Sequence, residues 1–375
     1  MTHVSSIQHT YYYGGISSLS GLRRALRECS PDIVIPCDDG VVLQLHALHQ
    51  RDPSLRPLIE RSLGPPENYS VVESRHRFLS AAVDLGIRVP RTRKIEKAED
   101  LTAWHRDLGS ASVLKVNGES GGNGVRISQS LDESLAAWRE LHAPCKIATA
   151  WKRLIIDLDP LPLWLRRGQS SREVTVQEFI PGRPANSMLV CWRGELLSLV
   201  SVVVVAAEGP TGAATIVRVI ENEEMKRVAQ LIASRLQLSG FCGLDFVLEA
   251  GTGAPYLIEM NPRCTQLGHL DLGSDGCLAG VLSATLRGEA PPQGQRLLRD
   301  KKIALFPQAL AAGDACRPYI DTSFHDVPIE EPRLVSELEM DSWPHRRWAA
   351  RIYHAFKPLY RADPVLFEGL ETDPV

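Results

Sequence analysis

The clearest alternation of polar and apolar residues along the chain lies in its third quarter. Residues 240–249 (GFCGLDFVLE) and 255–262 (PYLIEMNP) both alternate with a period of two, as strands with one buried face do. The five residues between them, AGTGA, contain two glycines and predict a turn,. We therefore expect a β-hairpin whose turn is centred on Thr252.

This pairing predicts a cluster of side-chain oxygens on one face of the hairpin. Asp245 is expected opposite Glu259 and Val247 opposite Leu257, with facing Cβ atoms about 5 Å apart. Asn261 lies two residues beyond Glu259 and should project from the same face. The other face should carry Phe246, Leu248, Tyr256, Ile258 and Met260. Two adjacent carboxylates repel unless a cation or a proton lies between them. All-oxygen ligands of this kind suit Mg²⁺, whereas the alternative interpretation is a solvated polar face on an edge hairpin.

A second pattern predicts a phosphate-binding loop. Residues 112–116 and 125–128 read as strands, and the loop between them, NGESGGNG, contains four glycines. Such a loop lets backbone N–H groups wrap phosphate oxygens, and Lys115 adds a positive charge. The loop matches neither the P-loop nor the G-x-G-x-x-G spacing. It does match G-x-S-x-G around Ser120, but a nucleophile there would need a helix to follow directly, and the next helix begins at Leu131, capped by Ser130 and Glu133,.

The remaining patterns predict a mixed α/β chain. Asp38 and Asp39 follow a predicted buried strand at 33–36, where they could contact a substrate or cap the next helix,. The stretch 146–172 contains Trp and basic residues and reads as either a mobile flap or a solvated helix. We predict strands at 173–180, 187–193, 196–206 and 302–306, a loop at 208–214, and helices from Ser18, over 74–85 with Gly86 as its cap, after Asn222 and over 275–286,.

Composition limits the classes of function. The chain has 375 residues and a net charge of −3, so we expect no nucleic-acid partner and no membrane partner. The eight cysteines form no C-x-x-C pair, which argues against a zinc site or a disulfide framework and favours a cytoplasmic location. The oligomeric state stays open.

Three motifs, taken in order, resemble the ATP-grasp superfamily: the loop LKVNGESGGNGVRI, the strand VQEFIPGR and the hairpin GLDFVL…YLIEMNPR. Biotin carboxylase, D-alanine–D-alanine ligase and carbamoyl-phosphate synthetase share this plan. The resemblance implies an α/β (α+β grasp) fold with ATP between two sheets. Its expected parts are a shortened, partial Rossmann-like domain over 1–90, a small ATP-grasp lobe over 91–182, a large lobe over 183–290 and a C-terminal extension over 291–375.

The resemblance also implies roles for individual residues. Asp245, Glu259 and Asn261 would bind two Mg²⁺ ions, with Mn²⁺ as a substitute, and Arg263 would stabilise an acyl phosphate. His269 could instead be a capping or core histidine. Those expected to contact ATP are Arg75 (where the family often has Lys), Lys115, Gly121, Gly122, Gly124, Gln177, Glu178, Phe179 and Ile180, and those near the acceptor are Thr265, Gln266 and His269.

The predicted activity is an ADP-forming, ATP-dependent carboxylate–amine ligase that joins a small carboxylic acid or amino acid to an amine through an acyl phosphate. The alternatives are an ATP-grasp enzyme that uses bicarbonate or carbamate, and a non-catalytic nucleotide-binding module.

Overall fold

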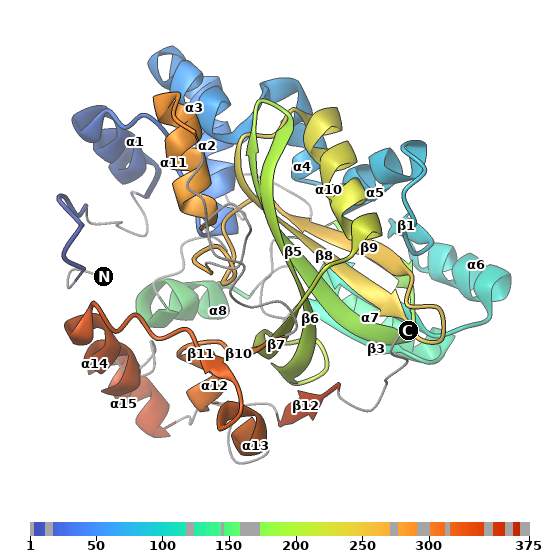
Figure 1. The fold of residues 1–375 in the computed structure, drawn as a ribbon. Coiled ribbons are helices and arrows are strands. Elements are labelled where there is room, and N and C mark those ends of the chain that lie inside the picture. Colours follow the sequence, from blue (N-terminus) through green and yellow to red (C-terminus); the bar gives the residue numbers. More distant parts are fainter. Residues whose placement is uncertain are drawn as a thin grey trace.

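Two β-sheets organise the molecule (Figure 1). The computed structural model of the chain describes residues 4–11, 18–117, 124–143, 146–157, 173–270, 277–290, 301–311, 316–340, 348–356 and 363–367. The smaller sheet has four strands in the order β1-β4-β2-β3, and the larger has eight, ordered β11-β10-β7-β6-β5-β8-β9 with β12 paired to β6. Within these ranges no helix is both long enough and apolar enough to cross a membrane.

The N-terminal part is helical where it is described. The predicted strand at 33–36 is wrong: the segment pairs with no described strand, and Ile35 is 40% exposed. Instead the Val34 N–H donates to Ser62 Oγ at 2.9 Å, because a short apolar run without partner strands cannot form a sheet. The helices are α1 (Ser18–Cys29), α2 (Asp39–Arg51), α3 (Arg56–Leu63), α4 (Tyr69–Val72) and α5 (Arg75–Asp84).

Local caps fix where these helices begin and end. Asp38 accepts a hydrogen bond from the Val41 N–H at 3.2 Å, which confirms the capping interpretation for this residue,. Ser74 caps α5, and Gly86 after it has φ 72°, as predicted for a left-handed cap,.

The smaller sheet has one face on helices and one face free for the site. Its strands are β1 (Thr92–Ile95), β2 (Ser112–Val116), β3 (Val125–Ser128) and β4 (Val174–Glu178). Leu114 and Val116 pack in a core with α6 (Ala98–Leu108) and α7 (Leu131–His142). Strand alternation therefore turns Lys115 to the opposite face. The predicted strands and the Ser130 cap of α7 are confirmed.

The larger sheet is covered by helices on both faces. Alternate residues of β5 pack against α5 and α10 on one side and α11 on the other,. A strand the sequence analysis missed, β7, lies where a loop was expected to lead directly into a helix. The elements are β5 (Gly182–Trp192), β6 (Glu195–Glu208), β7 (Ala214–Ile220), α10 (Glu223–Leu236), β8 (Gly240–Glu249), β9 (Pro255–Asn261) and α11 (Leu278–Arg287).

The hairpin of β8 and β9 has the predicted pair but not the predicted register throughout. Asp245 lies opposite Glu259, whereas Leu257 pairs with Phe246 rather than Val247 because a bulge follows Asp245,. Leu257 is consequently buried in the core, and Ile258, predicted on the far face, lines the cavity beside Glu259.

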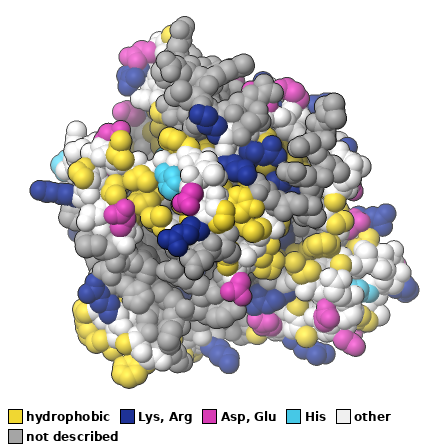
Figure 2. All heavy atoms as spheres, turned by 60° about the horizontal axis from the view of Figure 1, so that its bottom comes forward, with side chains coloured by type: hydrophobic (Ala, Val, Ile, Leu, Met, Phe, Trp, Pro, Cys, Tyr) yellow, Lys and Arg dark blue, Asp and Glu magenta, His cyan; other side chains and the backbone are white. Residues whose placement is uncertain are grey.

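The C-terminal part, predicted as an extension with one strand, adds strands to the larger sheet. β10 (Lys302–Ala304), at the predicted strand, pairs with β7, and β12 (Pro364–Leu366) pairs with β6. Trp348 and Phe356 of α15 are 76% and 84% exposed, and Figure 2 shows hydrophobic side chains among charged ones on this side of the molecule. The other elements are α8 (Ile147–Lys152), a π-helical turn (Arg153–Asp157), α12 (Gln308–Ala311), α13 (Arg317–Ile320), β11 (Phe324–His325), α14 (Pro332–Met340) and α15 (Trp348–Phe356).

Candidate active site

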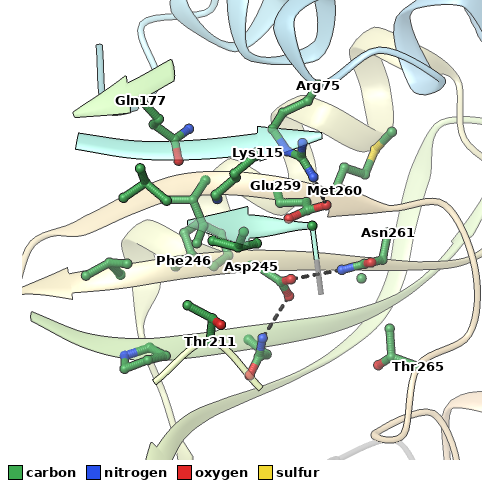
Figure 3. A pocket seen from close by; sticks show the side chains of 18 of the residues that line it. Arg75, Lys115, Gln177, Thr211, Asp245, Phe246, Glu259, Met260, Asn261 and Thr265 are labelled. Carbon is green, nitrogen blue, oxygen red and sulfur yellow. Dashed lines mark hydrogen bonds and ion pairs between the residues drawn. The ribbon is translucent and has the colours of Figure 1, made fainter. Parts of the chain in front are cut away.

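A cavity of about 700 Å³ lies where the two sheets face each other beside the N-terminal helices. The smaller sheet contributes Lys115 and Gln177, the larger sheet contributes Asp245 and Glu259, and α5 contributes Arg75. Figure 3 shows these side chains converging from separate elements on one space. The sequence-predicted oxygens of the hairpin thus face the sequence-predicted lysine.

Asp245 is the centre of an amide-lined carboxylate site. Its two oxygens accept hydrogen bonds from Asn186 Nδ2 at 2.7 Å and Asn261 Nδ2 at 2.9 Å, both drawn in Figure 3. Asn186 lies directly opposite Asp245 in the β5–β8 ladder. Sequence reasoning missed Asn186, although a polar residue inside an apolar strand was an available signal.

The two carboxylates of the hairpin have opposite pKa shifts. Burial and the neighbouring charge of Glu259 raise the pKa of Asp245, against the two asparagine hydrogen bonds and Lys115, which lower it. Burial also opposes ionisation of Glu259, but Arg75 and Lys115 outweigh it and lower the pKa of Glu259,. Of these two carboxylates, Asp245 is therefore the one with less stabilisation from nearby positive charge.

Arg75 occupies the position beside Glu259. Its Nη2 lies 2.5 Å from Glu259 Oε1, and its Nη1 donates to Asn117 Oδ1 at 3.2 Å. Asn117 Nδ2 in turn donates to Glu173 Oε1 at 3.0 Å, and the Ser74 hydroxyl donates to the same oxygen at 2.8 Å. This chain of hydrogen bonds joins the hairpin to the base of the Gly-rich loop and to the start of α5. Neither Asn117 nor Glu173 was assigned a role from the sequence.

Lys115 is nearly excluded from solvent, with 5% of its surface exposed. Burial is the main reason that its pKa falls from 10.5 to about 8; Arg75 lowers it further, while Glu259 and Asp245 raise it. The ammonium makes no hydrogen bond to any described side chain or backbone group. It is a buried cation that faces a cavity and two carboxylates.

The strand predicted to contact adenine lies along one edge of the cavity. Gln177, Glu178, Phe179 and Ile180 all line it. The Glu178 N–H donates to the Arg91 carbonyl at 2.9 Å and the Phe179 N–H to Ala111 at 3.1 Å. Those two N–H groups are therefore already used, and the Ile180 N–H makes no hydrogen bond to a described residue.

Arg263 lines the cavity two residues beyond Asn261. Its Nε donates to Asp39 Oδ1 at 2.8 Å, and its Nη2 lies 3.4 Å from Asn261 Oδ1. Although burial disfavours its charge, Asp39 and the nearby Asp245 raise the pKa of Arg263. Asp39, which the sequence left between two roles, thus fixes the predicted catalytic arginine in place.

The residues predicted near the acceptor have separate locations. Thr265 and Gln266 line the cavity, whereas His269 lies 2.9 Å from Asp326 and is not among the described cavity residues. The Thr265 hydroxyl donates to Met188 Sδ at 3.2 Å, and Gln266 Nε2 donates to the Ala214 carbonyl at 3.1 Å.

Part of the Gly-rich loop lies outside the described residues, including Ser120, Gly121 and Gly122. Gly124 is described, lines the cavity and accepts a hydrogen bond from the Val116 N–H at 3.0 Å. Over the described ranges no group of three or more His, Cys, Asp and Glu side chains could hold a metal. The hairpin offers two carboxylates, Asp245 and Glu259, and the amide of Asn261. A cation bound there would need further ligands from phosphates or water.

Residues 165–266 match the sequence family described as the ATP-grasp domain. No curated protein matches the chain significantly.

Several solved structures share the fold. The biotin carboxylase domain of 2-oxoglutarate carboxylase from Hydrogenobacter thermophilus, in complex with MgADP, ADP and bicarbonate, has a TM-score of 0.53 at 10% identity, covering 76% of this chain and 60% of that one. N5-carboxyaminoimidazole ribonucleotide synthetase from Thermus thermophilus has a TM-score of 0.52 at 18% sequence identity. The match covers 77% of this chain and 70% of that one. Biotin carboxylase from Campylobacter jejuni has a TM-score of 0.51 at 12% sequence identity, and the match covers 76% of this chain and 60% of that one. The chain thus spans less than two thirds of the length of the two biotin carboxylase structures.

Proposed function

On the premise that the chain carries an ATP-grasp domain, as predicted, we propose that it is an ADP-forming, ATP-dependent carboxylate–amine ligase. The observation that supports this proposal is the convergence of Lys115, Arg75 and Arg263 on the cavity that Asp245 and Glu259 line. Such an arrangement of cations and carboxylates suits phosphoryl transfer, in which a protein mainly positions groups and neutralises charge.

The hairpin residues fit a divalent cation. Asp245, Glu259 and Asn261 would hold Mg²⁺, two ions in our proposal, with Mn²⁺ as a substitute. The raised pKa of the buried Asp245 supports this fit, because a bound cation would favour its ionised form,. When bound, Mg²⁺ supplies charge neutralisation to the phosphates.

The other residues bind and orient the reactants. Lys115 donates to the phosphates, and Arg75 leaves Glu259 to contact them when nucleotide binds. Residues 177–180 hold the adenine, with the Ile180 N–H, which donates to no described residue, as the donor. The substrate carboxylate attacks the γ-phosphate, ADP leaves, and Arg263 stabilises the acyl phosphate. The amine then displaces phosphate, so the chain itself needs no nucleophile.

The second candidate is an enzyme that uses bicarbonate as the acid, which is favoured by the bicarbonate in one of the similar structures. The two chemistries differ in what ADP release requires. We expect ADP release from Mg-ATP to depend on an organic carboxylate and to persist in carbonate-free buffer. Release that depends on bicarbonate alone would favour the second candidate, and formation of AMP with pyrophosphate would contradict both.

A further inference from the structure

The larger sheet opens beside the cavity, and a C-terminal strand fills the opening. The ladder between β5 and β6 ends at the pair Ala185–Val203, although β6 continues to Glu208. β12 pairs with the edge of β6 that β5 leaves unpaired, with Val365 opposite Ala207. The ladder is extended by the Phe367 N–H, which donates to the Val205 carbonyl at 2.9 Å. Figure 1 shows β12 at this end of the sheet.

Phe367 therefore becomes part of the cavity wall, although it is more than 100 residues beyond the catalytic hairpin. Four apolar cavity residues belong to one hydrophobic cluster, Val204, Ala207, Leu267 and Phe367 itself, and Pro210, two residues after β6, lines the cavity as well. We call these five residues the apolar wall. Isolated apolar side chains on a surface need no explanation, but a contiguous set that lines a cavity is typical of ligand sites.

Two polar residues near the apolar wall have their hydrogen bonds inside the protein, whereas Thr211, directly after Pro210, lines the cavity and makes no hydrogen bond to a described residue. Thr265 donates to Met188 Sδ, and Gln266 donates to the Ala214 carbonyl. This part of the cavity consequently offers a ligand apolar surface more than hydrogen-bond donors.

Hydrogen bonds and strand pairs connect the apolar wall to Arg263. Gln266, three residues after Arg263, bonds to Ala214, and Ala214 pairs with Ala207, which pairs with β12. A cationic side chain and these apolar side chains therefore line the same cavity. A carboxylate that carries an apolar side chain is complementary to both.

We propose that the apolar wall is a specificity subsite that binds the apolar side chain of the organic carboxylate substrate, with Phe367 of the C-terminal strand closing it. This inference rests on the proposed ligase function and narrows its substrate class. Bicarbonate has no side chain and would leave such a subsite without a ligand.

The test compares matched carboxylates with the full-length protein. ADP release is measured with Mg-ATP and hydroxylamine, which traps the acyl group as a hydroxamate, for leucine against aspartate and methionine against glutamate. We expect kcat/KM at least about tenfold higher for the apolar member of each pair, since one buried methylene is worth roughly fourfold.

Variants of Phe367 then test whether the apolar wall causes the preference for apolar carboxylates. Phe367→Ala should lower kcat/KM for leucine and methionine by roughly tenfold or more, with the dissociation constant for ATP unchanged. Phe367→Leu keeps the strand and an apolar wall, so it should shift the preference toward substrates with larger side chains. This variant replaces Phe367→Ala in the test if Phe367→Ala does not fold. Phe356→Ala, at an exposed position of the same C-terminal part, is the matched control and should behave like wild type.

The outcomes separate this inference from the proposed function. ADP release with organic carboxylates but without preference for the apolar ones would overturn the inference alone. A loss of ATP affinity in both Phe367 variants would also overturn it, because the wall would then serve the nucleotide. ADP release that requires only bicarbonate would overturn the proposed function as well.

Discussion

Replacing Arg75 with methionine tests whether the hairpin face is a cation site without knowledge of the substrate. Arg75 is 7% exposed in its side chain, and its guanidinium lies 2.5 Å from Glu259, whose side chain is 28% exposed. Arg75→Met keeps most of the length of the side chain but leaves two neighbouring carboxylates with only Lys115 and Arg263, among the described residues, to balance them.

The magnitude follows from the burial of the pair. Removing one partner of a buried ion pair costs roughly 3–5 kcal/mol, and the partial exposure of Glu259 reduces this to about 2 kcal/mol. A loss of about 2 kcal/mol lowers Tm by roughly 4–8 °C in a domain of 150–250 residues. A divalent cation should reverse this loss, because the vacated position beside Glu259 then accepts it.

The assay is thermal unfolding in EDTA and in a Mn²⁺ titration without nucleotide. We expect Arg75→Met to be less stable than wild type in EDTA and to gain much more Tm from Mn²⁺ than wild type does. Arg88→Met, which removes an exposed pair with Glu224, is the matched control and should show neither effect,. Equal Mn²⁺-induced shifts in wild type and Arg75→Met would refute the assignment of Asp245 and Glu259 as cation ligands.

Three further predictions concern groups around the cavity. Lys115, with its pKa near 8, is charged below that pH and loses its proton above it in the free protein. The dissociation constant for ATP should therefore rise up to about tenfold per pH unit above pH 8. Calorimetry should find no such rise in Lys115→Met. Glu259→Gln should lower ADP formation by roughly 100-fold or more with an unchanged circular dichroism spectrum, and wild-type turnover would contradict the metal assignment. Interaction with the Cys264 thiol lowers the pKa of Cys37 to about 7, so alkylation of Cys37, followed by mass spectrometry of its peptide, should reach half its maximal rate near pH 7; Cys264→Ala should move that midpoint upward, and an unchanged midpoint would contradict the pairing.

The hairpin shows how far a sequence can define a site. A period of two and a Gly-containing turn were enough to place Asp245 opposite Glu259. The bulge that sends Leu257 into the core left no comparable signal, because one unpaired residue changes the register without changing the composition.

Other parts of the fold depend on tertiary pairing that local patterns do not contain. The run at 33–36 has the composition of a strand but no partner among the described strands, whereas β7 has both neighbours, β6 and β10. Likewise, nothing around Phe367 in the sequence indicates that it lines the cavity. Its position follows from the open edge of β6, which only the assembled sheet provides.

Transfer of oxygen from the substrate carboxylate to phosphate tests the central claim most directly. A carboxylate that supports ADP release is prepared with ¹⁸O in both carboxyl oxygens and turned over with Mg-ATP in unlabelled, carbonate-free water. Attack of the carboxylate on the γ-phosphate predicts that the released phosphate contains one ¹⁸O atom and that ADP forms in equal amount. Unlabelled phosphate, or label found in AMP, would contradict an acyl phosphate formed by this chain.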